Sequence, residues 1–334
     1  MDNMKKYLFL IEHLQLFSSH DITKSNNKFI YINNIRLLYI KGDLIMKKRL
    51  AKLCVGLLTL SMSFSIYGGQ VPSQTTPSTP ATEVTTKEEV EVAQNVIGVI
   101  GAMEEEVEIL KEKMNITDTV TAAGMTFYKG TLHNQQIVLA RSGVGKVNAA
   151  VCAQLMISLF DVNYLVNSGV AGTLKEGIDQ GDIVISTDAV QHDFDVTALG
   201  DPLGEISRLG VTFFEADEAL IDIAKEAFMN LKIKDVKAYQ GRVASGDQFI
   251  AGGPVQERIQ EHFAPSAVEM EGAAIAHVAY INQVPYVIIR AISDKANGEA
   301  DLSYEEFLPL AAKNASLLME EIIKLSATEL PAIN

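Results

Sequence analysis

Short apolar runs alternate with amphipathic segments from Asn95 to the C-terminus. Runs typical of buried strands cover residues 96–100, 137–140, 164–166, 182–185, 267–270 and 286–290. Apolar residues at three- and four-residue spacing predict helices over 104–113, 146–159, 215–229, 255–263, 272–281 and 304–325. Such alternation predicts a single three-layer α/β domain over residues 95–334, with a central mixed or parallel twisted sheet flanked by helices.

A different pattern precedes this domain. Met46 is followed by three basic residues, an apolar stretch over 53–67 and a Gly-Gly pair, which is the layout of a secretory signal peptide over 46–69. The stretch is shorter than the roughly 20 residues that a membrane span needs, although an uncleaved anchor stays open. We therefore expect an exported protein, periplasmic or extracellular, or a cytoplasmic one if the leader is not used.

The remaining N-terminal segments show no domain pattern. Residues 1–45 precede the better start signal and are interpreted as a possible over-extension of the reading frame. Residues 70–94 begin with a stretch rich in Pro, Thr and Ser that has almost no large apolar side chain. This composition cannot offset the entropy lost on ordering, so a flexible linker is expected there.

Charge and cysteine content narrow the function classes. Residues 1–69 hold ten Lys and Arg against four acids, which leaves 18 basic and 38 acidic residues, a net charge of −20, for residues 70–334. A body this acidic repels phosphate backbones and anionic lipid, so we expect no nucleic-acid or membrane partner for the folded domain. The two cysteines, Cys54 and Cys152, cannot form a disulfide framework or a Cys-based metal site.

Acids stand where predicted strands end, which is where ligands bind in open α/β sheets. Glu106 closes a run of three acids after the first strand, and Asp294 follows the last one. Either acid could instead cap a helix. Glu269 and Glu271 interrupt an apolar segment, and a buried carboxylate needs a partner. A ribose diol would suit Glu271, with a buried salt bridge as the alternative.

Two Gly-rich turns, over 142–146 and 167–172, allow close backbone approach, and neither matches a P-loop. Phe249 follows a further turn and could stack on a purine or pack in the core. His192 stands beside two aspartates in a superficially metal-like group, for which a hydrogen-bonding role in a loop is the favoured interpretation.

Four ordered segments carry a resemblance to a known family: IGAMEEEV at 100–107, SGVGKV at 142–147, VEME at 268–271 and RAISD at 290–294. They are similar to the signature segments of 5′-methylthioadenosine/S-adenosylhomocysteine nucleosidases, from about Val96 to Leu325. The resemblance implies a nucleoside phosphorylase-like fold, a homodimer, a nucleoside substrate and no cofactor or metal. It also implies hydrolysis of the N-glycosidic bond of methylthioadenosine and S-adenosylhomocysteine, and of 5′-deoxyadenosine as a further candidate.

The same resemblance assigns roles to residues. Glu106 would activate water, Asp294 would protonate adenine N7, and Glu271 would hold the ribose hydroxyls over Met270. Arg290 and Ser293 would support Asp294 and the ribose end. The implied base pocket comprises Phe249, Ile250, Val170, Ala171 and Gly172, and Val144 is implied as a further substrate-binding residue. Tyr304 would line the 5′-substituent pocket, and Val196 and Leu199 would reach that of the partner subunit.

Two rival functions remain at this point. A purine nucleoside phosphorylase would use phosphate in place of water, but a phosphate site favours Arg and backbone donors over three acids. A nucleoside-binding protein without turnover would share the fold. The presence of all three carboxylates favours the hydrolase.

Overall fold

The computed structural model describes residues 27–32, 35–40, 43–45, 95–297 and 300–331 of the chain, which divides into two units, Met1–Thr86 and Lys87–Asn334. In the first unit β1 (Asn27–Ile32), β2 (Ile35–Ile40) and β3 (Asp43–Ile45) form a three-stranded antiparallel sheet. The sequence pattern predicts no element there, although the β-branched and aromatic residues of these strands suit a sheet. The predicted signal peptide and linker lie outside the described residues.

A ten-stranded mixed sheet forms the centre of the second unit. Its strands are β4 (Val96–Gly101), β5 (Asn115–Ala122), β6 (Met125–Leu132), β7 (Gln135–Arg141), β8 (Tyr164–Gly172), β9 (Ile183–Gln191), β10 (Phe214–Glu215), β11 (Ala238–Ser245), β12 (Ala267–Glu269) and β13 (Tyr286–Asp294). The order is β10-β9-β11-β12-β8-β4-β7-β6-β5, with β13 pairing both β8 and β9.

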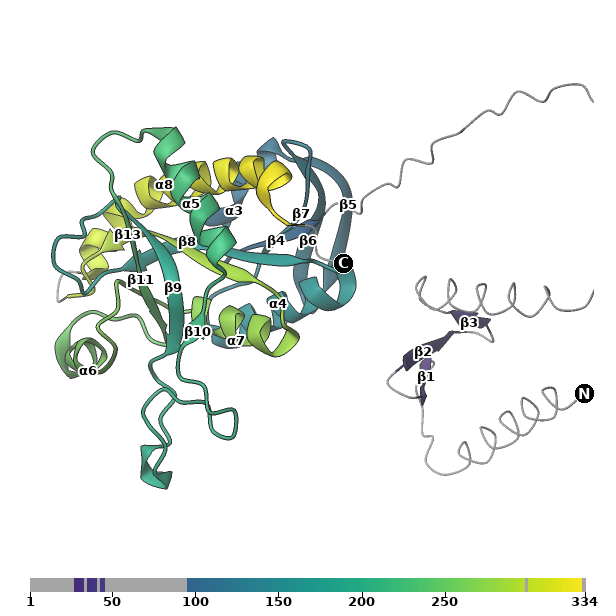
Figure 1. Ribbon diagram of the computed structural model, residues 1–334, viewed down its shortest axis with the longest axis horizontal. Coiled ribbons are helices and arrows are strands. Elements are labelled where there is room, and N and C mark those ends of the chain that lie inside the picture. Colours follow the sequence, from purple (N-terminus) through teal and green to yellow (C-terminus); the bar gives the residue numbers. More distant parts are fainter. Residues whose placement is uncertain (1–26, 33–34, 41–42, 46–94, 298–299, 332–334) are drawn as a thin grey trace, which may run out of the picture. The chain divides into compact units, whose positions relative to one another are not determined.

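Helices cover both faces of this sheet, as Figure 1 shows. They are α3 (Glu104–Lys113), α4 (Lys146–Phe160), α5 (Glu218–Leu231), α6 (Gly253–Phe263), α7 (Gly272–Asn282) and α8 (Ala300–Glu329). One buried core packs α3, α5 and α8 against the sheet, and a second packs α4 and α7 against the other face. The predicted three-layer α/β architecture is confirmed.

The structure adds strands that the apolar runs do not predict. Most positions of β5 are exposed, and β11 mixes polar and small residues, so neither has an apolar run. The predicted helix start at 215 is wrong, because Glu215 pairs within β10 and Asp217 caps α5 by accepting a hydrogen bond from Leu220 N at 3.0 Å.

Strand β8 organises the functional edge of the sheet. All nine of its residues are buried, and it pairs in parallel with β4 on one side and β13 on the other. The carboxyl ends of the three strands therefore meet at one edge, which is where an α/β sheet binds its ligand.

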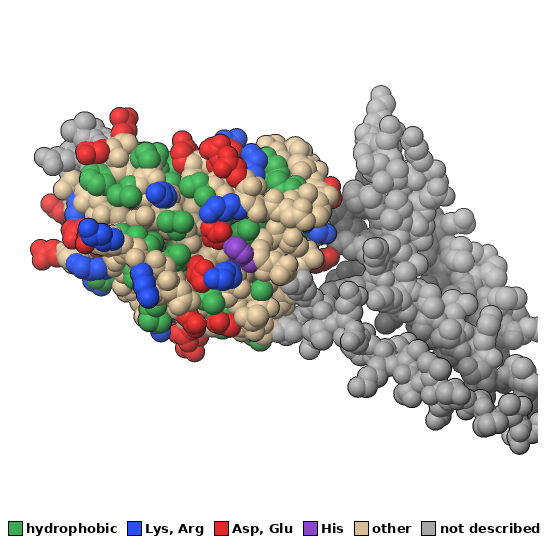
Figure 2. All heavy atoms as spheres, turned by 90° about the horizontal axis from the view of Figure 1, so that it is seen from above, with side chains coloured by type: hydrophobic (Ala, Val, Ile, Leu, Met, Phe, Trp, Pro, Cys, Tyr) green, Lys and Arg blue, Asp and Glu red, His purple; other side chains and the backbone are tan. Residues whose placement is uncertain are grey.

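Cys152 lies fully buried on α4 within the second core. Burial raises the pKa of its thiol to about 12, so the thiol is inert rather than nucleophilic. Over the part of the chain that the structure describes, no helix has the length and apolar character needed to cross a membrane. On the face shown in Figure 2, acidic and basic side chains are interspersed with apolar ones, without an extended basic patch.

Candidate active site

A pocket of about 100 Å³ opens at the carboxyl edge of β8. Its walls are made by Ala102, Met103, Glu106, Val144, Val170, Ala171, Gly172, Phe249, Val268, Glu269, Met270, Glu271, Ser293, Asp294 and Tyr304. Segments from almost the whole length of the domain therefore meet here, and most of the predicted site residues are among them.

Glu106 enters the pocket from the first turn of α3. Its buried carboxylate accepts hydrogen bonds from the backbone N–H groups of Ala102 at 2.6 Å, Met103 at 3.0 Å and Val170 at 3.0 Å. Capping and placement in the pocket are thus not alternatives, because one oxygen caps α3 while the other faces β8. Burial raises the pKa of Glu106, although the positive charge of Arg290 opposes this shift.

Asp294 ends β13 on the other side of β8. Its carboxyl group accepts hydrogen bonds from Ala296 N at 2.7 Å and from Ser293 Oγ at 2.9 Å. Burial raises the pKa of Asp294, and these two hydrogen bonds oppose the shift only in part. An aspartic acid in such surroundings can hold a proton nearer to neutral pH than an exposed one.

Two glycines of β8 make room for these acids. A Cβ atom at Gly169 would lie 2.5 Å from Glu106 Oε1, and one at Gly172 would lie 2.6 Å from Asp294 Oδ1. Any side chain at either position would displace the carboxyl group beside it. Glu106 and Asp294 therefore both lie against β8, at two glycines that are three residues apart.

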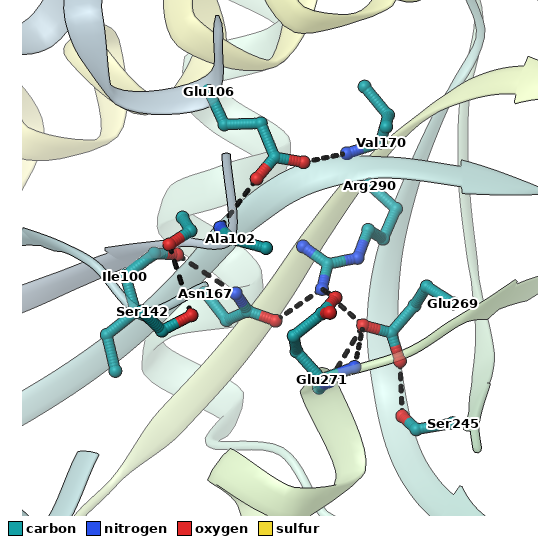
Figure 3. A network of polar contacts seen from close by, with 12 residues as sticks. Ile100, Ala102, Glu106, Ser142, Asn167, Val170, Ser245, Glu269, Glu271 and Arg290 are labelled. Carbon is teal, nitrogen blue, oxygen red and sulfur yellow. Dashed lines mark hydrogen bonds and ion pairs between the residues drawn. The ribbon is translucent and has the colours of Figure 1, made fainter. Parts of the chain in front are cut away.

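A buried Arg290 stands among three glutamates (Figure 3). Its Nη2 atom donates to Glu269 and, at 2.6 Å, to Asn167 Oδ1, and lies 3.8 Å from Glu271 Oε2. Burial by itself raises the pKa of Glu269. The charge of Arg290 and the hydrogen bond from Ser245 lower the pKa by more, so that it lies below its ordinary value. Glu269 is thus the principal partner of the arginine.

Among the described residues, the carboxyl group of Glu271 accepts one hydrogen bond, from Gly145 N at 2.8 Å. Burial and the neighbouring Glu269 raise its pKa to about 7. Arg290 was expected to support Asp294 and the ribose end. Its guanidinium is held by Asn167 and Glu269 and lies 3.8 Å from Glu271, the predicted ribose ligand, and no contact with Asp294 is seen among the described residues. Ser293 does contact Asp294, as expected.

Aromatic rings close the outer part of the pocket. The half-exposed Phe249 meets Tyr304 edge to face with ring centroids 5.6 Å apart, and the Tyr304 hydroxyl lies 3.3 Å from Met103 Sδ. Burial, followed by the charge of Glu106, raises the pKa of Tyr304 to about 12. Ile250 lies buried beside a smaller adjoining cavity.

Val196 and Leu199 lie outside this pocket, at the start and end of a single turn of 3₁₀ helix (Thr197–Leu199). Leu199 is 82% exposed. Their predicted role concerns a partner subunit and stays a prediction.

The two aspartates beside His192 make loop contacts, but the predicted hydrogen-bonding role is not seen at the Nε2 atom of His192, which is buried and has no hydrogen-bond partner among the described residues. Asp193 binds Lys146 Nζ at 2.5 Å, and Asp195 contacts Thr197 and Arg258. Among the described residues, no cluster of three or more His, Cys, Asp or Glu side chains could hold a metal ion.

Sequence reasoning missed the residues that orient the glutamates. Asn167 donates to Ile100 O at 2.9 Å while accepting from Arg290, and Ser245 donates to Glu269 and accepts from Ala273 N at 2.7 Å. A polar Asn within the apolar run of β8 was the one available signal, because a buried amide requires partners.

Comparison with known proteins agrees with this geometry. Residues 96–324 match the model of the phosphorylase superfamily. The 5′-methylthioadenosine/S-adenosylhomocysteine nucleosidase of Psychromonas ingrahamii is 46% identical over 229 residues, which cover 68% of this chain and 97% of that protein.

Two solved structures give the same picture. The nucleosidase of that name from Neisseria meningitidis, in complex with methylthio-immucillin-A, is 41% identical with a TM-score of 0.66, over 69% of this chain and 99% of that one. Futalosine hydrolase of Helicobacter pylori is 35% identical with a TM-score of 0.65, over 69% and 98%. With this match in sequence and fold, the chain belongs to the 5′-methylthioadenosine/S-adenosylhomocysteine nucleosidase family of the phosphorylase superfamily.

Proposed function

We propose that this protein hydrolyses the N-glycosidic bond of 5′-methylthioadenosine and S-adenosylhomocysteine, releasing adenine and the 5-substituted ribose. The observation that carries the proposal is the placement of two buried carboxyl groups, Glu106 and Asp294, against Gly169 and Gly172 of one strand. Cleavage through an oxocarbenium-like transition state needs a base for water and an acid for the leaving group, and a pair of carboxyl groups supplies both.

Glu106 is the base. Its three backbone donors hold the carboxylate in one orientation, and its raised pKa increases its affinity for the proton of the attacking water. The water oxygen bonds to C1′ of the ribose as its proton moves to Glu106.

Asp294 is the acid. Its carboxyl group passes a proton to adenine N7 while the bond between C1′ and N9 breaks, so adenine departs as a neutral molecule. The raised pKa of Asp294 favours the protonated form that this step requires, and Ser293 orients the group. After each turnover Glu106 releases its proton to solvent, and Asp294 takes up a proton from solvent.

Glu271 binds the 2′- and 3′-hydroxyl groups, with Met270 packed under the sugar. Because Arg290 is held by Glu269 and Asn167, Glu271 keeps acceptor capacity for the ribose. Phe249 covers the base, and the Ile250 backbone reads its edge. Tyr304 borders the 5′ substituent.

Water is the nucleophile, rather than phosphate. Arg290 is surrounded by three glutamates, an arrangement that repels a phosphate dianion from the attacking side. In phosphate-free buffer, the full-length protein should release adenine and 5-methylthioribose from methylthioadenosine. Dependence on added phosphate with a sugar phosphate as product would establish a phosphorylase, and stoichiometric binding with no adenine formed over hours would establish a binding protein.

The preferred 5′ substituent is measured in the same assay. Methylthioadenosine, S-adenosylhomocysteine and 5′-deoxyadenosine are compared by kcat/KM, with futalosine added because a hydrolase of that compound shares the fold. The proposal expects the first two to be the best substrates, and a preference for futalosine would contradict it.

We also propose a homodimer and export. Exposed apolar residues on α4, among them Val147 at 74% and Leu159 at 53%, suit burial by a second subunit. Sedimentation velocity should give twice the chain mass.

N-terminal sequencing of the native protein should start just after Gly68 or Gly69, and a start before Lys41 would contradict the signal peptide.

A further inference from the structure

The first turn of α4 is capped by other segments of the chain. Its N-cap residue, Gly145, has no side chain that could accept a hydrogen bond. The N–H groups of Gly145 and Lys146 donate instead to side chains of other segments. Gly145 N donates to Glu271, and Lys146 N donates to Asp247 Oδ1 at 2.8 Å. Carboxylates are favourable at a helix N-terminus, where N–H groups lack partners within the helix.

These two carboxylates belong to different segments of the chain. Glu271 lines the pocket and is the proposed ribose ligand, whereas Asp247 lies outside the pocket lining, two residues before Phe249, which the proposed function places over the base. One helix terminus thus contacts both binding elements. The approach is close, since a Cβ at Gly145 would lie 3.1 Å from Asp247 Oδ1, and the φ of +97° at this residue already favours glycine.

A third acid closes the contacts into a ring. Asp193 accepts from Asp247 N at 2.9 Å through one oxygen and from Lys146 Nζ at 2.5 Å through the other. Lys146 and Asp193 are mostly buried, with 17% and 23% of their side chains exposed, and Gln191 Oε1 lies 3.2 Å from Lys146 Nζ. Screening is weaker here than at a fully exposed pair.

We propose that Asp193, Lys146 and Asp247 form a clasp that holds the base-covering loop at a set distance from the ribose carboxylate. The three are positioning residues, because none of them lines the pocket. The clasp rests on the proposed function in one respect, namely that Phe249 covers adenine. Holding the loop in place before binding reduces the entropy lost when the base is bound.

The test uses adenine, which occupies the base site without turnover. Asp193→Asn keeps an acceptor for Asp247 N but loses the charge facing Lys146. The matched control is Asp188→Asn, because Asp188 on β9 pairs with Arg242 on β11 at 2.5 Å with similar burial and lies outside the pocket.

In the full-length protein, Asp193→Asn should raise the adenine Kd in calorimetry by about tenfold or more, and raise KM more than it lowers kcat. Asp188→Asn should leave the adenine Kd within twofold of the native value. The double variant Lys146→Met with Asp193→Asn should weaken adenine binding no more than either change alone, because both changes remove the same ion pair between Lys146 and Asp193.

Equal adenine affinity in Asp193→Asn and the native protein would overturn the clasp, and so would equal losses in Asp193→Asn and its control. Fully additive losses in the double variant would overturn it as well. If Asp193→Asn fails to fold, Lys146→Met carries the same comparison, with Lys146→Arg expected to restore binding. A failure of the proposed function would be seen separately: the native protein would bind adenine but would not hydrolyse nucleosides.

Discussion

At the scale of residues, the chemistry depends on which carboxyl groups hold protons. Glu106, Glu271 and Asp294 all have a raised pKa, with burial as the largest cause in each case, whereas Arg290 lowers that of Glu269. A single arginine therefore divides four acids into one structural anion and three groups that titrate closer to neutral pH.

Replacing the proposed acid separates chemistry from binding. Asp294→Asn keeps the size of the side chain but cannot supply the proton for N7, so kcat should fall by about 10²- to 10⁴-fold. The adenine Kd should change far less. Adenine release followed by absorbance and calorimetry measures the two effects, and a kcat equal to that of the native protein would refute the assignment.

Glu271 gives a prediction on stability. Its pKa is about 7 in the folded chain against an ordinary 4.5, so the folded state binds this proton more tightly than the unfolded state does. The free energy of unfolding therefore falls as the pH rises from about 4.5 to 7. Glu271→Gln removes this cost and can still accept the hydrogen bond from Gly145.

The Tm of Glu271→Gln should exceed the native Tm by a few degrees at pH 8 and match it near pH 4.5, whereas its KM for methylthioadenosine should increase. Calorimetric scans at both pH values test the first expectation. A difference in Tm that is the same at both would contradict the raised pKa.

At the scale of elements, β8 determines where both proposed catalytic carboxyl groups, those of Glu106 and Asp294, lie. Gly172→Ala would place a methyl group against Asp294 and also 3.0 Å from Ala296 Cβ. We expect a loss in kcat of at least about tenfold, because misplacement by about 1 Å can cost two orders of magnitude. Kinetics per mole of folded protein measures it.

A control for steric strain is Gly241→Ala on β11. The added Cβ would meet Ser266 Oγ at 2.0 Å, away from the pocket, so this variant should lose stability while its folded fraction keeps the native kcat. Equal losses of kcat in both variants would show that the effect of Gly172→Ala is not local.

Helices were largely predictable at this scale, and strands less so. The apolar spacing over 104–113 gives the bounds of α3, because α3 buries one face only. Strand β5 is exposed at most positions and β11 lacks an apolar run, so their pairing depends on partners distant in sequence. The partner of Arg290 was unpredictable for the same reason, because Glu269 contacts it from a different strand, β12.

At the scale of the whole molecule, the ordered motifs identify the site because the fold brings strand ends together. Glu106, Glu271 and Asp294 each had an alternative role in the sequence, and all three line one pocket. The sequence could not reveal how the segments lining the pocket are positioned relative to one another, because this depends on contacts between distant residues, such as those of Asn167 and Asp193.

A dimer prediction also belongs to this scale. Val147→Asp places a charge on an exposed apolar position of α4, so it should shift the sedimentation coefficient toward that of the single chain if this face is the interface. The matched variant Met229→Asp changes a residue on α5 that is 65% exposed and should leave the assembly intact. An unchanged dimer in Val147→Asp would exclude this face.

The buried Cys152 bears on the proposed export of the protein. An oxidising compartment attacks thiolates, and a thiol with a pKa of about 12 and no exposed surface offers almost none. The nucleosidase domain would then need neither a reductant nor a disulfide partner after secretion. Thiol-labelling reagents should modify Cys152 only when the domain unfolds, which makes this side chain a built-in reporter of unfolding.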